Sequence, residues 1–135
     1  MKMDYSKEEN FINRFIRKNR RERLLYELTT PEKRYRGVSR FCHQAEDFLD
    51  HNKIILKDND LEHDPKFIDF VKTHDEPCYV ISPDPYLDDQ SISLKEALDK
   101  AVLCQDALLI LGSDFAIIFT EPMKGGTEKY LLSDD

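Results

Sequence analysis

The chain has 135 residues, of which 40% are hydrophobic and 35% are charged, and its net charge is −7. This length fits one domain of ordinary size, and eight Phe and six Tyr residues suffice for an apolar core, which excludes wholesale disorder. No apolar run approaches the roughly 18 residues that cross a bilayer, and the opening MKMDYSKEEN lacks the apolar segment of a secretory signal. We therefore expect no membrane association and a cytoplasmic location.

Charge is divided unevenly along the chain. Residues 1–41 hold 12 Lys or Arg against 6 Asp or Glu, whereas residues 42–135 hold 8 against 21. The net charges of the two parts are +6 and −13. This distribution indicates either an arm that binds polyanions or a basic helical layer that packs on its own acidic domain.

The first apolar groups have helical spacing. Ser6 and Glu9 match a capping box, and four apolar residues follow between positions 11 and 16. The next apolar group, in residues 24–28, lies on nearly the opposite side of the same helix. We predict a break near Asn19. The alternative is one long helix that buries different faces against different partners, which suggests a dimer or a docking surface.

A second helical region follows. Thr30-Pro31 is a typical helix start, with Pro at the first helical position. Gly37 is expected to interrupt this helix, and the apolar spacing after it predicts an amphipathic helix from about 38 to 50. The first fifty residues are therefore predicted to be almost wholly helical.

The pattern changes after Asp50 to short apolar segments that are typical of strands. Helices are expected after Asp64-Pro65 and after a second capping box formed by Ser93 and Glu96. The predicted strands are residues 53–56, 78–82, 107–111, 115–120 and 130–132.

The last three predicted strands indicate how the sheet is built. The turn Gly112-Ser113-Asp114 joins the first two of them as a hairpin, and the third completes a meander. The runs ALLIL and FAIIF are continuously apolar, so we expect both faces of these strands to be covered, with the helices of the first half as the cover. The predicted class is α+β: a single domain in which the mainly helical residues 1–50 pack on a sheet of about four or five strands within residues 51–135, ending in an antiparallel meander.

Six cations fall within one short basic segment. Phosphate binding needs such a cluster, and arginine favours bidentate contacts to phosphate or carboxylate. The overall charge of −7 repels polyanions at long range, which disfavours nucleic acid as the ligand. The polyanion-binding candidates are Arg14, Arg17, Lys18, Arg20, Arg21 and Arg23.

The segment DPYLDD, residues 84–89, is the second candidate site. Its carboxylates resemble ligands for a hard cation, but the spacing of an EF-hand is absent, and Asp beside Pro is ordinary turn chemistry. A rim that binds a basic partner fits better, with the tyrosine as an aromatic anchor. The predicted partner-binding residues are Asp84, Tyr86, Asp88 and Asp89.

No other motif indicates a metal, a cofactor or catalysis. The three cysteines form no CxxC pair, which predicts buried free thiols. His63, His74 and Cys78 are a conceivable zinc set, although nothing in their spacing requires one. The Gly-Gly segment 123–127 joins two predicted strands and therefore indicates a hairpin loop and not a phosphate loop.

The sequence favours a non-catalytic protein-interaction module of a regulatory or inhibitor type, such as an immunity protein that faces a basic toxin. The alternative is a nucleic-acid-associated protein that uses the basic segment. An enzyme assembled from dispersed residues such as His43, His74 and Asp84 is a third reading. Both a monomer and a homodimer are left open.

Overall fold

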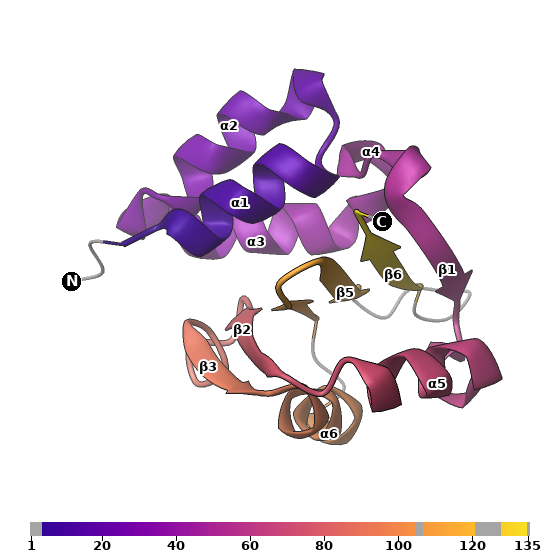
Figure 1. Cartoon of the computed structure of the whole chain (residues 1–135). Helices are drawn as coiled ribbons and strands as arrows, with labels where there is room; N and C mark the ends of the chain where they lie inside the picture. The colour runs from indigo at the N-terminus through magenta and orange to yellow at the C-terminus, as the bar shows by residue number, and fades with distance from the viewer. Residues whose placement is uncertain (1–3, 105–106, 121–127, 135) are drawn as a thin grey trace.

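A computed structural model describes residues 4–104, 107–120 and 128–134. Within these ranges the chain forms an antiparallel sheet in the order β1-β6-β5-β4-β2-β3, and helices cover both of its faces (Figure 1). The strands are β1 (Ile54–Asp58), β2 (Pro77–Ile81), β3 (Gln90–Ser93), β4 (Leu108–Leu111), β5 (Phe115–Phe119) and β6 (Lys129–Ser133).

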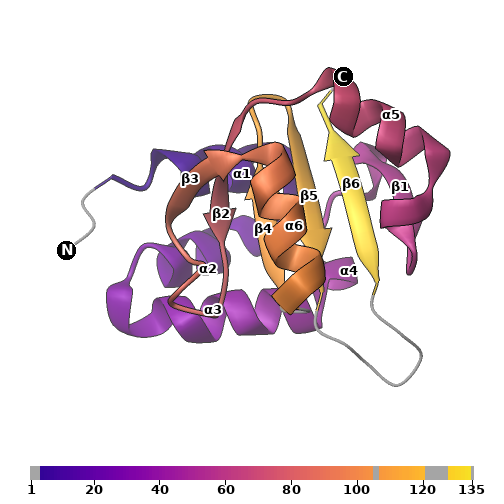
Figure 2. The ribbon, with the colours of Figure 1, turned by 90° about the horizontal axis from the view of Figure 1, so that it is seen from below.

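The helices lie in two layers on opposite faces of the sheet. The first four are on one face, and α5 and α6 are on the other (Figures 1 and 2). No helix in the described ranges is both long enough and apolar enough to cross a membrane. The helices are α1 (Ser6–Phe15), α2 (Lys18–Leu28), α3 (Pro31–His43), α4 (Ala45–Phe48), α5 (Pro65–Thr73) and α6 (Leu94–Cys104), with short 3₁₀ turns at His51–Lys53 and Leu61–His63.

The predicted α+β class is confirmed, and so is the meander of β4, β5 and β6. The predicted number of strands is too low, because the sheet has six. The missed strand is β3, an edge strand of sequence QSIS that pairs only with β2. Its two serines are exposed, so it lacks the apolar run by which the other strands were predicted.

Alternate residues of the central strands enter two separate apolar cores. Leu109 and Leu111 pack with α1 to α4, whereas Leu108 and Ile110 pack with α5 and α6. Successive side chains of a strand point to opposite faces, so both sets of a continuously apolar strand are buried only when both faces are covered. The prediction of a doubly covered sheet is confirmed, although helices from the second half of the chain supply one of the two covers.

The predicted break between the first two helices is present, but it lies at Ile16 and Arg17, slightly before Asn19. Ile16 is extended and forms an isolated antiparallel bridge with Leu49. The Arg17 N–H donates to the Phe48 carbonyl at 2.9 Å. Backbone pairing with residues over thirty positions away therefore sets where the helix ends, whereas the displaced apolar group indicated only that a break was nearby. The capping box of Ser6 and Glu9 is wrong, since Asp4 accepts the hydrogen bond from the Ser6 N–H.

The expected interruption at Gly37 is also wrong, because α3 continues through this residue. A Cβ atom at Gly37 would lie 2.7 Å from the Cβ of Glu27, so glycine here allows α2 and α3 to approach closely. The helix instead ends at His43, and the short α4 replaces the rest of the helix predicted for residues 38–50.

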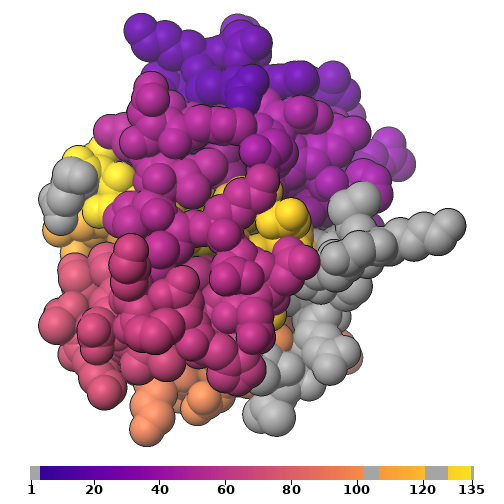
Figure 3. All heavy atoms as spheres, turned by 90° about the vertical axis from the view of Figure 1, so that its right-hand side faces the viewer, coloured from indigo at the N-terminus to yellow at the C-terminus, as the bar shows by residue number. Residues whose placement is uncertain are grey.

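The basic excess lies in the first helical layer, whereas the acidic excess of the second half lies mainly outside its helices. Helices α1, α2 and α3 hold 10 Lys or Arg against 5 Asp or Glu, whereas α5 and α6 together hold 4 Lys against 3 Asp or Glu. The other nine acidic residues of 58–100 lie outside these two helices. Figure 3 shows the indigo and purple helical layer at one pole of the molecule and the orange helix α6 at the other, with α5 and β1 between them. The charge asymmetry of the sequence therefore corresponds to a basic first helical layer and to acidic segments that connect the later elements.

Candidate functional site

The acidic loop, residues 84–89, is a compact turn that follows β2. The Asp84 carbonyl accepts from the N–H groups of Leu87 at 3.0 Å and Asp88 at 2.9 Å, and the Asp84 carboxylate accepts from the Tyr86 N–H at 2.9 Å. These bonds turn the Tyr86 side chain outward, where it is 85% exposed. The loop thus displays an aromatic ring to solvent from a hydrogen-bonded backbone.

Arg34 of α3 holds the end of this loop. Its guanidinium donates to both carboxylate oxygens of Asp88, at 2.7 and 2.9 Å, and to Glu8 of α1 at 2.8 Å. Glu8 is fully buried, and the Arg34 side chain is only 12% exposed. Burial alone would lower the pKa of Arg34, but the hydrogen bonds and negative charges of Asp88 and Glu8 outweigh it and raise the pKa further. Arg34 therefore stays charged and ties together α1, α3 and the loop.

Tyr79 of β2 extends these contacts to the last residue of the loop. Its hydroxyl lies 2.8 Å from a Glu8 oxygen and 2.6 Å from an Asp89 oxygen. Burial, followed by these hydrogen bonds, raises the pKa of Tyr79, so the hydroxyl keeps its proton. Asp89 has a φ of 61°, a left-handed conformation that Asp tolerates better than most residues. We call Glu8, Arg34, Tyr79, Asp88 and Asp89 the Arg34 cluster.

The four predicted partner-binding residues thus have different environments. Asp88 is bound bidentately by Arg34, and its charge is largely neutralised. Asp89 is exposed but anchored to Tyr79. Asp84 shapes the turn and stays half-exposed, and Tyr86 points into solvent.

Three arginines of the predicted basic segment form ion pairs or hydrogen bonds with other parts of the fold. Arg14 forms ion pairs with Asp134 at 2.7 Å and with Asp114 at 3.6 Å. Arg17 donates to the carbonyls of Leu49 and Glu46, and Arg21 donates to that of Ile16 at 2.7 Å. These bonds fasten α1 and α2 to the C-terminal strand and to the segment before β1.

The other three cations lie on the surface of α2. Lys18, Arg20 and Arg23 are exposed, and none of them forms an ion pair with another described residue. The Arg20 guanidinium lies over the Phe48 ring, 5.3 Å from its centroid. The basic segment is therefore part of the globule, with half of its cations turned inward.

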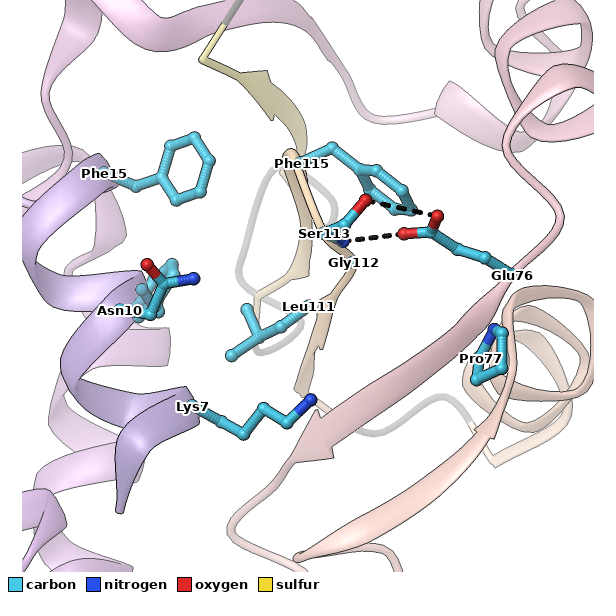
Figure 4. A pocket seen from close by; sticks show the side chains of 10 residues that line it. Lys7, Asn10, Phe15, Glu76, Pro77, Leu111, Gly112, Ser113 and Phe115 are labelled. Atoms are coloured by element: carbon cyan, nitrogen blue, oxygen red, sulfur yellow. Dashed lines mark hydrogen bonds between the residues drawn. The ribbon is translucent and has the colours of Figure 1, made fainter.

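A cavity of about 250 Å³ lies between α1 and the end of the sheet where β4 turns into β5 (Figure 4). Lys7, Asn10 and Phe15 reach it from α1, and Leu111 faces them from β4. On the far wall, Glu76 accepts hydrogen bonds from the N–H group of Ser113 at 2.6 Å and from its hydroxyl at 3.2 Å. The cavity combines an apolar interior with charged groups at its mouth.

A larger groove of about 590 Å³ separates α5 from α6. Phe67, Ile68 and Leu98 contribute apolar surface to it, and Ile68 is 39% exposed. Three carboxylates and two lysines also line the groove: Glu62, Asp75, Asp99, Lys72 and Lys95.

The conceivable zinc set of His63, His74 and Cys78 is not assembled. His63 contacts Asp60 at 2.7 Å, and the His74 ring stacks on Phe70. In the described ranges, the one group with the spacing of metal ligands is Asp60, Glu62 and His63, which is largely exposed, and Lys129 binds its Glu62. Cys42 and Cys78 are buried and outside any disulfide, as predicted, whereas the side chain of Cys104 lies outside the described part of the structure. Burial, together with the charges of Glu76 and Asp75, raises the pKa of Cys78 to about 12. The Gly-Gly segment 123–127 lies outside the described residues.

The sequence interpretation missed the buried members of the Arg34 cluster. Glu8 precedes Phe11 and Phe15 at spacings of three and seven residues, so it lies on the apolar stripe of α1. Arg34 precedes Val38 and Phe41 on α3 at spacings of four and seven residues, so it also lies on an apolar stripe. A charged residue on each of two apolar stripes was the available signal of a buried ion pair, because a buried charge needs a partner.

Comparison with protein-family models, with curated proteins and with solved structures finds no match to this chain.

Proposed function

We propose that this protein is a non-catalytic interaction module of the regulatory or inhibitor type, which binds a partner protein through the acidic loop. The observation that carries the proposal is the Tyr86 side chain, 85% exposed on a turn whose end is anchored by Arg34 and Tyr79. Aromatic residues are frequent binding hot spots. A loop that is already ordered loses little conformational entropy when it binds.

Charge specifies the kind of partner. Asp84 and Asp89 flank Tyr86, and residues 58–100 hold three times as many acidic as basic side chains. Such a surface attracts a basic protein and speeds its association. A basic enzyme held inactive by this protein, such as a nuclease toxin, belongs to this class of partner.

The state of the buried charges supports a non-catalytic role. Carboxylates that are buried, as Glu8 and Asp88 largely are, are the usual candidates for a general acid or base. Both form ion pairs with Arg34, which engage them in the fold. We interpret this arrangement as a structural support of the loop.

A comparison of four forms of the protein tests the proposal. Tagged wild type, Tyr86→Ala, Asp84→Asn/Asp89→Asn and Tyr35→Ala are used to capture proteins from the native host at low and at high salt. We expect a basic partner whose affinity falls about 30-fold, equivalent to about 2 kcal/mol, in Tyr86→Ala. We expect the double variant to associate with this partner more slowly than the wild type at low salt. Tyr35→Ala is the control, because Tyr35 is also an exposed tyrosine, at 67%, and lies on α3. We expect this variant to retain the partner.

Capture of the same proteins in the same amounts by all four forms would contradict the proposal. Asn at position 89 keeps the side-chain oxygen that lies near the Tyr79 hydroxyl, so the double variant tests charge and leaves the fold of the loop intact.

Nucleic-acid binding is the alternative, and the exposed Lys18, Arg20 and Arg23 are the observation in its favour. We expect the wild type and the variant Lys18→Glu/Arg20→Glu/Arg23→Glu to bind DNA and RNA equally weakly in a filter-binding assay. Arg17 and Arg21 are left unchanged because their guanidinium groups donate hydrogen bonds to backbone carbonyls within the fold. Micromolar binding that the variant loses, with a steep dependence on salt, would favour the alternative.

A further inference from the structure

The cavity beside α1 carries opposite charges on its two walls. Lys7 and Asn10 lie one helical turn apart on α1, and Glu76 stands opposite them, just before β2 (Figure 4). No ion pair joins Lys7 to Glu76, and no described residue accepts a hydrogen bond from the Lys7 ammonium group. Lys7 and Glu76 therefore line the same cavity, and both can contact a ligand bound there.

Glu76 is held in place without being saturated. Each of its carboxylate oxygens accepts one hydrogen bond from Ser113, at 2.6 and 3.2 Å. A carboxylate offers about four acceptor positions, so about two remain for a ligand. The β4–β5 turn thus orients the carboxylate and leaves it able to receive a cation.

The walls between these charges are apolar. Phe11, Phe15 and Leu111 are almost completely buried and line the cavity together with Phe115. Burial of a small apolar group against them contributes roughly 25 cal/mol for each Å² of apolar surface removed from water. Charge recognition at the mouth and apolar contact inside are both available to one ligand.

The volume limits the size of that ligand. About 250 Å³ is smaller than the roughly 300–1,000 Å³ of pockets for drug-sized ligands. A nucleotide or a sugar chain is too large for it, whereas a free amino acid has the required size.

We infer that this cavity binds a zwitterionic amino acid with an apolar side chain. The ligand carboxylate accepts hydrogen bonds from the Lys7 ammonium and the Asn10 amide, its ammonium group donates to Glu76, and its side chain packs against Phe15 and Leu111. The flexible four-carbon stem of Lys7 lets the ammonium adjust to the ligand. The site lies at the opposite end of β2 from the acidic loop, so its residues differ from those of the interaction proposed above.

Titration of the ¹⁵N-labelled protein with L-leucine, followed by NMR, tests the inference. We expect shifts of the amides of α1 and of residues 111–115 that saturate at about 10 mM, tenfold above a Kd of about 1 mM. N-acetyl-leucine lacks the ammonium group and leucine amide lacks the carboxylate, so each is expected to bind at least about tenfold more weakly, a loss of about 1.4 kcal/mol. If only one of these analogues bound as well as leucine, the site would recognise a single charge, and the inference would be overturned.

Two variants separate recognition from folding. Lys7→Gln changes an exposed side chain, and Glu76→Gln keeps an oxygen that accepts from the Ser113 N–H. Each is expected to lower the affinity for leucine about tenfold or more without changing the urea midpoint, whereas Lys95→Gln on α6 retains full affinity. Unchanged affinity in both cavity variants, or no shift with leucine, would also overturn the inference.

Discussion

Replacement of Arg34 by alanine is expected to lower the free energy of unfolding by about 3–5 kcal/mol, because removal of one partner leaves buried charge uncompensated. Glu8 is 0% exposed and Asp88 18% exposed in their side chains, and both would lose their cationic partner. Urea denaturation followed by circular dichroism measures the loss. Arg34→Lys is expected to recover only part of it, since an ammonium group does not reproduce the bidentate contact with Asp88.

Arg36→Ala is the matched control for this prediction. Arg36 is exposed and lies on the same helix, so its replacement is expected to change the stability by no more than about 0.5 kcal/mol. Equal effects of the two substitutions would contradict the role of Arg34 as the central cation of the cluster.

Replacement of Phe41 by alanine is expected to destabilise the protein by about 3–5 kcal/mol, the usual cost of a large cavity in an apolar core. Phe41 is 2% exposed, and its ring meets those of Phe11 and Phe48 edge to face, with centroids 5.9 and 5.6 Å apart. It therefore joins α1, α3 and α4 into one layer. The urea midpoint should fall without a change in the slope of the transition.

Tyr35→Ala on the same helix is the control for Phe41→Ala, and its effect is expected to stay within about 0.5 kcal/mol because the ring is 67% exposed. A loss below about 1 kcal/mol for Phe41→Ala would show that the first helical layer is not packed on the sheet as described.

The class of fold could be predicted from the sequence because its main signals are local. The runs around Leu109 and Ile117 are apolar at every position, which indicates strands covered on both faces. Asp64 caps α5 through the Lys66 N–H, as the Asp-Pro pair predicts. The Ser93 hydroxyl accepts from the Glu96 N–H, as expected from the second capping box.

The errors arose where distant segments determine the local structure. Gly37 was interpreted as a helix interruption, but it serves the contact with Glu27 of the neighbouring helix. The break between α1 and α2 was predicted near Asn19, but its position after Phe15 depends on the pairing of Ile16 with Leu49. Neither cause is visible in a window of adjacent residues.

The candidate site could be predicted only in part for the same reason. The composition of the loop indicated Asp84 and Tyr86 as surface residues. The binding of Asp88 by Arg34 joins residues 54 positions apart, and that of Tyr79 by Glu8 joins residues 71 apart. The residues that position the loop were therefore not predictable from its own sequence.

Site-specific photo-cross-linking in the native host tests the central claim, that the acidic loop is the surface on which a protein partner binds. A photoreactive phenylalanine is placed at position 86 in one form of the protein and at position 35 in another. We predict a discrete protein adduct at position 86, lost at high salt, and none at position 35. The same adducts at both positions, or no protein adduct at position 86, would contradict the claim.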